Sequence, residues 1–270
     1  MVVISESVYD KIVNFILNYK GLAIECEADL ESQFPDIPPN ALKSILSKQG
    51  QNLTKSFYSR NHLKSNAILK EYKERVKDDK TIMEMSMEYK CPPMSICRMI
   101  LNELYSKTDV KEMLKDPNCI PDQLLSANVF TCIFNDSQDG IIIDMVRYTV
   151  GEEYEVKLKQ LAREAGLIFY DEGDLRRDGF DKTPDLLLAV QTMYKNTIIN
   201  WIESKASFGD CESHTRYLND QLQSYYNRFG VGIVVYWAGF HENILNKSKT
   251  NLIILDDFPS KDDFEKLTFQ

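Results

Sequence analysis

Apolar residues recur three and four positions apart through roughly the first 116 residues, which is the spacing of an amphipathic helix. This pattern predicts helices at 7–19 and 28–34, one that is capped by Asn40, and two more at 81–89 and 95–105. The Pro-rich turn PDIPPN follows the second helix, and the turn KCPP lies between the last two. We therefore expect an all-helical N-terminal region that contains two helix-turn-helix units.

The pattern changes after residue 118. A helix is predicted at 121–134, and a long helix follows that ends near Gly166, a residue suited to a C-terminal cap. Strands are predicted at 167–170, 185–190, 197–205 and 232–237, with a helix at 214–229 and a weak strand at 251–255. The chain is thus expected to be α+β, with a helical domain at 1–118 and a mixed α/β domain at 119–270.

Composition places the chain among ordinary globular proteins, with 43% hydrophobic and 27% charged residues. The N-terminus lacks the regions of a signal peptide, and no window approaches the roughly 18 apolar residues that span a bilayer. We expect neither secretion nor membrane crossing. The six cysteines form no CxxC pair, which favours reduced thiols of an intracellular protein over a zinc site.

Charge is spread unevenly along the chain. The formal net charge of -9 argues against a surface that is generally coated with nucleic acid. Between Ala41 and Lys70, however, basic residues occur without any Asp or Glu, and this segment begins on the second helix of the first helix-turn-helix unit. It is the one local electrostatic indication of a nucleic-acid contact, and a solvated helix face is the alternative. The segment contains Lys43, Lys48, Lys55, Arg60, His62, Lys64 and Lys70.

Three charged residues are expected to meet on two neighbouring strands. Pro184 begins one strand and places Asp185 near the mouth of the sheet. In the next strand, Glu203 and Lys205 are two residues apart and project from one face. Such a trio is costly unless a cation joins the oxygens, and Mg²⁺ or Mn²⁺ prefers ligands of this kind. We predict that the trio is catalytic and that both carboxylates, with the carbonyl of Ser204, bind the metal.

This constellation suits the hydrolysis of a phosphodiester bond. The metal would lower the pKa of water and neutralise the charge that grows on the phosphate. Lys205 would orient or deprotonate the attacking water, and both roles stay open because burial and the neighbouring carboxylates shift its pKa in opposite directions. The alternative for Glu203 and Lys205 is an exposed, salt-bridged strand edge.

The flanking segments carry further candidates. Glu155 adjoins the apolar side of the helix before the first strand, where it would bind a second metal or a water; alternatively it is one acid on a solvated face. Gln221 and Tyr225 lie one turn apart on the helix after the lysine strand, and Lys182 precedes the Thr-Pro-Asp segment. These three are candidates for substrate binding, with simple packing as the alternative for Gln221.

In this order the residues resemble the PD-(D/E)xK nuclease superfamily, in which a helix with Glu, a strand with Asp, a strand with (D/E)xK and a QxxxY helix follow one another. The segments KTPD, WIESKASFGD, DQLQSYYNRFG and VVYW are similar to the codanin-interacting nuclease family, a TPD-motif family linked to congenital dyserythropoietic anaemia. The resemblance spans nearly the whole chain and is strongest from 151 to 237.

The resemblance implies a restriction-endonuclease-like C-terminal domain after helix-turn-helix segments. It also implies a metal-dependent nuclease of the nucleus and cytoplasm, and a codanin-like protein partner that regulates histone supply and erythroid maturation. We therefore expect a Mg²⁺- or Mn²⁺-dependent endonuclease that cleaves DNA or a structured nucleic acid. One alternative is a nuclease-fold interaction module with little or no catalysis. A helix-turn-helix transcription regulator is the least favoured, because residues 1 to 116 carry little positive charge.

Overall fold

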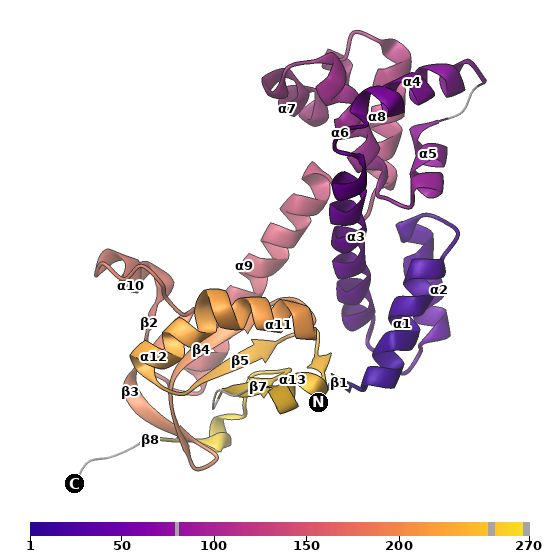
Figure 1. Ribbon diagram of the computed structural model, residues 1–270. Coiled ribbons are helices and arrows are strands. Elements are labelled where there is room, and N and C mark those ends of the chain that lie inside the picture. The colour runs from indigo at the N-terminus through magenta and orange to yellow at the C-terminus, as the bar shows by residue number, and fades with distance from the viewer. Residues whose placement is uncertain (79–80, 248–251, 267–270) are drawn as a thin grey trace. The chain divides into compact units, whose positions relative to one another are not determined.

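The computed structural model describes residues 1–78, 81–247 and 252–266 (Figure 1). The chain divides into two compact units. One, the helical unit, is Lys11–Arg147, and the other, the sheet unit, joins Met1–Asp10 to Tyr148–Gln270. This division lies later than the boundary predicted at residue 118, because a helix beyond that point contributes Leu125 and Val129 to the core of the preceding helices. Within the described residues, no helix is both long and apolar enough to cross a membrane.

The N-terminal region is helical, as predicted. Phe57, Ile82, Met85 and Ile100 are fully buried in one core, which shows that the apolar positions of separate helices face each other. The helices are α1 (Glu6–Asn18), α2 (Ala23–Gln33), α3 (Pro39–Asn61), α4 (Ser65–Arg75), α5 (Ile82–Tyr89), α6 (Pro93–Leu104), α7 (Lys107–Lys115), α8 (Gln123–Asn135) and α9 (Ile141–Glu164), with short 3₁₀ turns at Val76–Asp78 and Pro117–Cys119.

Both predicted helix pairs are present, as α2 with α3 and α5 with α6. Helix α5 starts with a capping box, in which Thr81 Oγ1 accepts from the N–H of Glu84. It ends at Lys90, which adopts a left-handed conformation with a φ of 51°. Proline at the first position of α6 then begins the next helix. The helix pairs lie close to where the sequence predicts them, but α3 begins at Pro39 after the N-cap Pro38, so Asn40 is not its cap. DNA contact through the helices stays a prediction.

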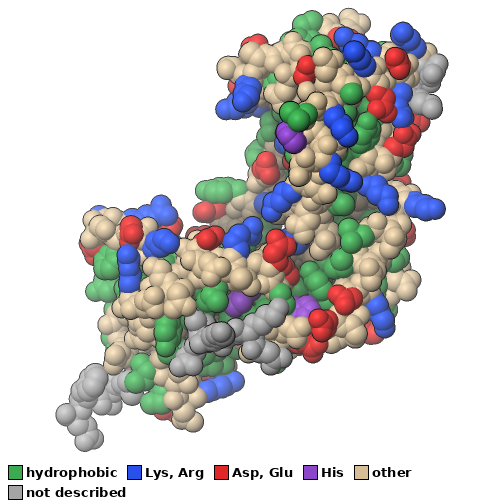
Figure 2. All heavy atoms as spheres, viewed as in Figure 1, with side chains coloured by type: hydrophobic (Ala, Val, Ile, Leu, Met, Phe, Trp, Pro, Cys, Tyr) green, Lys and Arg blue, Asp and Glu red, His purple; other side chains and the backbone are tan. Residues whose placement is uncertain are grey.

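The basic segment lies on α3, α4 and the turn between them. Lys43 forms an ion pair of 2.8 Å with Glu27, so its charge is balanced by the neighbouring helix. On the face of the helical unit shown in Figure 2, basic side chains are interspersed with acidic ones. The segment therefore gives no more than a local excess of positive charge.

A mixed sheet forms the centre of the sheet unit, also as predicted. Its central pair, β3 and β4, is antiparallel, whereas β4, β5 and β7 run parallel. The strand order is β2-β3-β4-β5-β7, and β8 pairs with β3. The strands are β2 (Phe169–Asp171), β3 (Leu186–Tyr194), β4 (Thr197–Lys205), β5 (Gly232–Tyr236), β7 (Ile253–Leu255) and β8 (Phe264–Lys266).

Two predicted strands differ from the observed ones in their ends. Strand β3 continues beyond residue 190 and reaches a turn in which Lys195 and Asn196 have positive φ. The predicted strand at 251–255 is observed as β7, and Asn251 lies outside the described residues. A separate two-stranded parallel sheet joins the N-terminus, β1 (Val3–Ile4), to β6 (Phe240–His241).

Helices cover both faces of the main sheet. Leu158 of α9 packs on one face with Ile202 and Val235. The other face packs Trp201 and Val234 against α11 (Cys211–Tyr217), a π-helical segment (Leu218–Leu222) and α12 (Gln223–Phe229), which lie over the sheet in Figure 1. Because side chains alternate along a strand, Glu203 and Lys205 share the face of Trp201 and point toward these helices. The unit also contains α10 (Glu172–Arg177), α13 (Asn243–Lys247) and a 3₁₀ turn at Lys261–Asp263.

Candidate functional site

The register between β3 and β4 brings two acidic residues side by side. Leu186 pairs with Ile202, so the preceding residue, Asp185, lies beside Glu203. The N–H of Asp185 donates to Oε2 of Glu203 at 3.2 Å, and the N–H of Ser204 donates to Oδ2 of Asp185 at 2.6 Å. The strand pair itself therefore fixes both carboxylates, as the sequence predicts.

Lys205 completes the trio on the same face. Its Nζ donates to Oε1 of Glu203 at 2.7 Å, and the side chains of the two residues are 14% and 5% exposed. An exposed salt-bridged strand edge was the alternative for this pair. The burial of both side chains excludes that alternative, so the pair lies inside the sheet unit rather than on its rim.

Electrostatics favour the uncharged form of Asp185. Burial raises the pKa of its carboxyl well above the usual range, and the negative charge of Glu203 adds to this effect. The N–H of Ser204 and the ammonium of Lys205 act in the opposite direction. When Asp185 is uncharged, Lys205 balances Glu203; when Asp185 loses its proton, two carboxylates face a single ammonium, and an additional cation would neutralise the excess negative charge.

Lys205, in contrast, is held in its charged form. Burial acts to lower the pKa of its ammonium, but Glu203 and then Asp185 oppose burial, and the pKa is raised above its usual value. Of the two roles that the sequence leaves open, this environment favours positioning of water or phosphate over removal of a proton.

Of the three candidates for substrate binding, Gln221 contacts the trio itself, whereas Tyr225 and Lys182 connect the segment before Asp185 to the helices over the sheet. Oε1 of Gln221 accepts from Nζ of Lys205 at 3.1 Å, so Gln221 helps to fix the ammonium. The hydroxyl of Tyr225 donates to the carbonyl of Thr183 at 2.7 Å, which supports the turn before Asp185. Lys182 lies on the exposed side, where its Nζ donates to the backbone carbonyl of Asp220 at 2.6 Å.

Glu155 reaches the same region from α9. It is half-buried, and burial followed by the charge of Glu152 raises its pKa. The charge of Glu155 raises the pKa of Asp185, and the charge of Glu203 raises the pKa of Glu155. Glu155 is therefore part of the same electrostatic cluster as Asp185 and Glu203.

The residue that sequence reasoning missed is Tyr217. Its ring centre lies 4.7 Å from Nζ of Lys205, close enough for a cation–π interaction. The signal was present in the sequence, because Tyr217, Gln221 and Tyr225 are spaced four residues apart. Its position in an apolar helix pattern made Tyr217 look like a packing residue only.

The donor set determines which metal would fit this site. Asp185 and Glu203 offer carboxylate oxygens, and neither Cys nor His contributes, which suits Mg²⁺ or Mn²⁺ better than zinc. In the part of the chain that the structure describes, no group of three or more His, Cys, Asp or Glu side chains is arranged to hold a metal ion. The protein would thus supply a small part of the coordination shell, as is usual for Mg²⁺, which retains several waters.

Comparison with known proteins gives matches over nearly the whole chain. A family model described as "Protein of unknown function TPD sequence-motif" matches residues 121–258, which include Thr183, Pro184 and Asp185. CDAN1-interacting nuclease 1 of Xenopus tropicalis is 36% identical over 269 residues, which cover 95% of this chain and 88% of the relative. The protein of that name from Homo sapiens is 34% identical and covers 96% of both chains.

A further relative of the same name, from Danio rerio, is 34% identical over 87% of this chain and 83% of its own length. No solved structure matches the chain. The sequence identity, and the large share of both this chain and its relatives that the matches cover, show that the chain belongs to the family of CDAN1-interacting nuclease 1 proteins. This family carries the TPD motif.

Proposed function

We propose that Asp185, Glu203 and Lys205 form the active site of a divalent-cation-dependent nuclease with a PD-(D/E)xK-like arrangement. The observation that carries the proposal is the convergence of the three groups: Nζ of Lys205 lies 2.7 Å from Glu203, whose second oxygen accepts from Asp185. Two buried carboxyl groups beside one ammonium suit the binding of an additional cation and of an anionic substrate. The word nuclease in the names of the relatives supports the same class of reaction.

Asp185 and Glu203, with the backbone carbonyl of Ser204, would hold Mg²⁺ or Mn²⁺, and Glu155 is the candidate for a second position. When bound, such a cation supplies positive charge to the phosphate and lowers the pKa of water. The raised pKa of Asp185 means that its carboxyl gives up a proton when the cation binds. Cation affinity should therefore increase with pH.

Lys205 acts in this proposal as a fixed positive charge. Glu203 and Gln221 hold its Nζ, and the ring of Tyr217 lies over it, so the ammonium has little freedom to turn away. A fixed ammonium orients an attacking water and stabilises the negative charge of the transition state without reorganisation. Lys182, on the exposed side, is the candidate for a contact with the phosphate backbone of DNA or a structured nucleic acid.

A cleavage assay of the full chain tests the proposal. It uses labelled single-stranded, duplex, flap and junction DNA in the presence of MgCl₂, MnCl₂ or EDTA. We expect metal-dependent cleavage that falls about 100-fold or more in Lys205→Met and in Asp185→Asn. Lys261→Met, an exposed lysine of the same unit, is the matched control and should cleave normally. Cleavage that survives Lys205→Met unchanged would identify a contaminating nuclease and overturn the assignment.

We also propose that the chain acts with a codanin-like protein, in the nucleus and the cytoplasm. The support is the printed name of the relatives, which describes them as CDAN1-interacting. Copurification of the full chain with the codanin-like protein of the same organism tests this part. A failure to copurify would leave the nuclease assignment unaffected, because the two proposals rest on separate observations.

The second candidate function is an interaction module that retains the nuclease site without turnover. One observation favours it: Glu203 is already neutralised by Lys205 and bonded by Asp185, so the site is internally satisfied without a metal. Calorimetry with MnCl₂ separates the candidates. Absence of binding, together with unchanged partner binding by Asp185→Ala, would favour the interaction module.

A further inference from the structure

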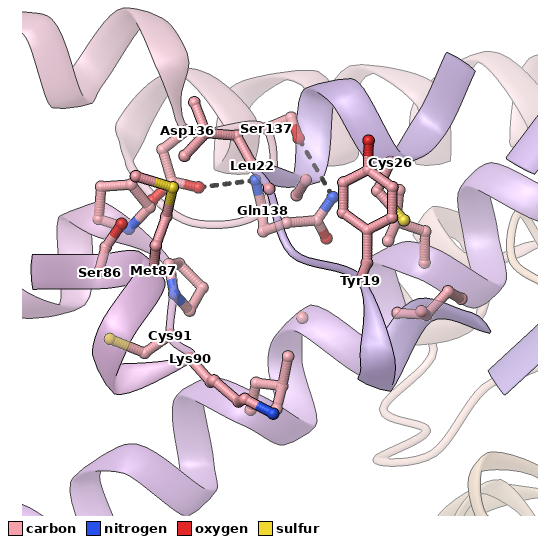
Figure 3. Close-up of a pocket in the computed structure, with 18 of the residues that line it drawn as sticks. Tyr19, Leu22, Cys26, Ser86, Met87, Lys90, Cys91, Asp136, Ser137 and Gln138 are labelled. Atoms are coloured by element: carbon pink, nitrogen blue, oxygen red, sulfur yellow. Dashed lines mark hydrogen bonds between the residues drawn. The ribbon is translucent and has the colours of Figure 1, made fainter. Parts of the chain in front are cut away.

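The helical unit contains a cavity with a volume of about 430 Å³, which Figure 3 shows. Gln138, in its wall, has an Oε1 atom without a hydrogen-bond partner among the described residues. That atom is buried and packs against Gly50 of α3, where a Cβ would lie 2.5 Å from it, so an occupant of the cavity cannot contact it. The sheet unit, by contrast, contains a buried residue, Trp237, whose contacts lead to the proposed nuclease site.

Trp237 directly follows β5 and is 6% exposed. Its backbone N–H donates to the carbonyl of Lys205 at 3.1 Å, which extends the parallel pairing of β5 with β4 by one residue. Because side chains alternate along a strand, Trp237 shares the face of Val235, which packs with Leu158 of α9. The indole ring therefore lies on the face of the sheet opposite to Glu203 and Lys205.

The indole nitrogen connects Trp237 to the strand that carries Glu203 and Lys205. Nε1 donates to Oγ of Ser204 at 2.8 Å. The backbone N–H of Ser204 in turn donates to Oδ2 of Asp185 at 2.6 Å. Ser204 thus joins the indole ring to the carboxylate of Asp185, and its own carbonyl is the proposed backbone ligand of the metal.

The ring of Trp237 also contacts one turn of α9. Tyr154 stacks on it, with the ring centres 5.2 Å apart and an angle of 25° between the ring planes. Nζ of Lys157 lies 4.2 Å from a ring centre of Trp237, which is within the range of a cation–π interaction. Glu155 lies between these two residues in the sequence, so both contacts hold the turn that carries its carboxylate.

This attachment keeps Glu155 in place against repulsion. Beyond the effect of burial, the charge of Glu203 raises the pKa of Glu155, and the charge of Glu155 raises the pKa of Asp185. The three carboxylates therefore repel one another when they are ionised. Contacts with an aromatic ring hold the acidic turn near the sheet without a further negative charge.

We propose that Trp237 is a positioning residue of the nuclease site, which sets the distance between the carboxylates of Asp185 and Glu155 by holding Ser204 and residues 154–157. The inference rests on the proposed function, because it concerns the binding of cations at that site. Loss of the indole frees both attachments, and loss of its contacts with α9 alone frees Glu155, the candidate ligand of a second cation.

Titration of the full chain with MnCl₂ tests the proposal, with the free ion measured by electron paramagnetic resonance. We expect a tighter and a weaker ion in the wild type, and Asp185→Asn should bind neither. Trp237→Leu should bind the weaker ion about tenfold less well, the lower end of the range for residues that orient metal ligands. Tyr148→Leu, an exposed aromatic residue of α9, is the matched control and should bind both ions normally.

The conservative variant Trp237→Phe separates the two attachments. It lacks the N–H that Ser204 accepts but keeps a ring for Tyr154 and Lys157, so it should restore the affinity for the weaker ion. A Trp237→Phe variant that binds this ion as poorly as Trp237→Leu would show that the ring contacts do not hold Glu155, and would overturn the proposal.

Glu155→Gln identifies the group through which Trp237 acts. It should weaken the weaker ion, and its combination with Trp237→Leu should bind that ion no less well than Glu155→Gln alone, because the two residues act as a unit. Losses that add in the combined variant would mean that Trp237 acts on the fold in general and would refute a positioning role.

Tyr154→Leu removes the stacking contact from the helix side and should also weaken the weaker ion, which keeps the test decisive if Trp237→Leu does not fold. Normal binding of both ions by Tyr154→Leu and by Trp237→Phe, or a wild type that binds the tighter ion alone, would overturn the proposal. A wild type that binds no Mn²⁺ would instead refute the proposed nuclease site, and with it the role of Trp237.

Discussion

At the residue scale, the buried pair of Lys205 and Glu203 determines how the sheet unit responds to the loss of either charge. With 14% and 5% of their side chains exposed, neither is well hydrated, and each depends on the other for neutralisation. Asp185 also depends on Lys205, because burial and the charge of Glu203 raise the pKa of its carboxyl and the charge of Lys205 lowers it. We therefore expect that binding of a cation at this site changes the free energy of unfolding of the sheet unit.

Lys205→Met should lower the free energy of unfolding by about 3 kcal/mol, because it leaves Glu203 buried without its cation. MnCl₂ should recover part of this loss, since the ion supplies the missing positive charge. Chemical denaturation with and without MnCl₂ measures both effects. Lys115→Met, which removes an exposed ion pair, is the control and should change stability by less than about 1 kcal/mol. An equal gain from MnCl₂ in every protein would mean that the ion binds elsewhere.

Asp136 gives the helical unit a predicted dependence on pH. Burial raises the pKa of its carboxyl from 3.8 to about 6, against the lowering effect of the backbone N–H groups of Met94, Gln138 and Asp139. Its pKa is higher in the folded chain, so its contribution is fully present below pH 3.8 and is lost as the pH rises toward 6. The total loss is about 3 kcal/mol.

Asp136→Asn cannot ionise, so its stability relative to the wild type should increase by up to that amount between pH 4 and pH 7. Urea denaturation at several pH values measures the difference. Ser137→Ala, in the same turn, should show a difference that does not vary with pH. A difference for Asp136→Asn that is also independent of pH would show that the carboxyl is ionised normally in the folded chain.

The sequence predicted the trio correctly as a set of neighbours because strand alternation and strand pairing follow from local patterns. Residues whose partners come from distant elements were harder to interpret. Tyr217 meets the ammonium of Lys205 only because its helix packs on β4. Gln221, which was expected to bind substrate, forms a hydrogen bond with Lys205. Their catalytic and binding roles stay predictions.

At the element scale, the helical segment that covers Glu203 and Lys205 departs from regular geometry. The predicted helix at 214–229 is observed as α11, a π-helical segment (Leu218–Leu222) and α12. A π-helical turn contains an extra residue, which changes the direction of all later side chains. Hydrophobic periodicity does not reveal such an insertion, because Tyr217, Leu222 and Tyr225 still face the sheet.

Deletion of Asn219, an exposed residue of this segment, should restore a regular helix and turn Gln221 and Tyr225 by about 100° relative to Tyr217. The contact with Lys205 or that with Thr183 must then break. We expect normal helix content by circular dichroism and a fall in cleavage rate of about 10- to 100-fold. Asn219→Ala keeps the length and should retain activity. Full activity after the deletion would mean that the π-helical turn does not position the site.

At the scale of the whole molecule, the first ten residues, which include the start of α1, belong to the sheet unit. Ile4 is 2% exposed, and β1 pairs with β6 through bonds such as that from Glu242 N–H to the carbonyl of Ile4. Sequence patterns do not predict this pairing, because two residues are too few for a recognisable strand pattern. Local patterns also do not reveal the boundary between the two units, because α8 is a helix whether it belongs to the helical unit or to the sheet unit.

Ile4→Ala should destabilise the sheet unit by about 3 kcal/mol through the loss of buried apolar contacts. Hydrogen exchange measured by mass spectrometry should become faster in peptides of β5 and β7 and stay unchanged in peptides of α6. Ile24→Ala, at a position that is 49% exposed, is the control and should leave both unchanged. Faster exchange confined to α6 would assign the N-terminus to the helical unit instead.

An anomalous difference map from crystals grown with MnCl₂ tests the central proposal most directly, because anomalous scattering locates manganese. The proposed nuclease site predicts a peak with oxygen atoms of both Asp185 and Glu203 within about 2.0 to 2.6 Å, the range for hard divalent cations. In the same map Lys205 should remain beside Glu203. A map without a peak at these carboxylates, from crystals saturated with the ion, would contradict a metal-dependent nuclease site in this protein.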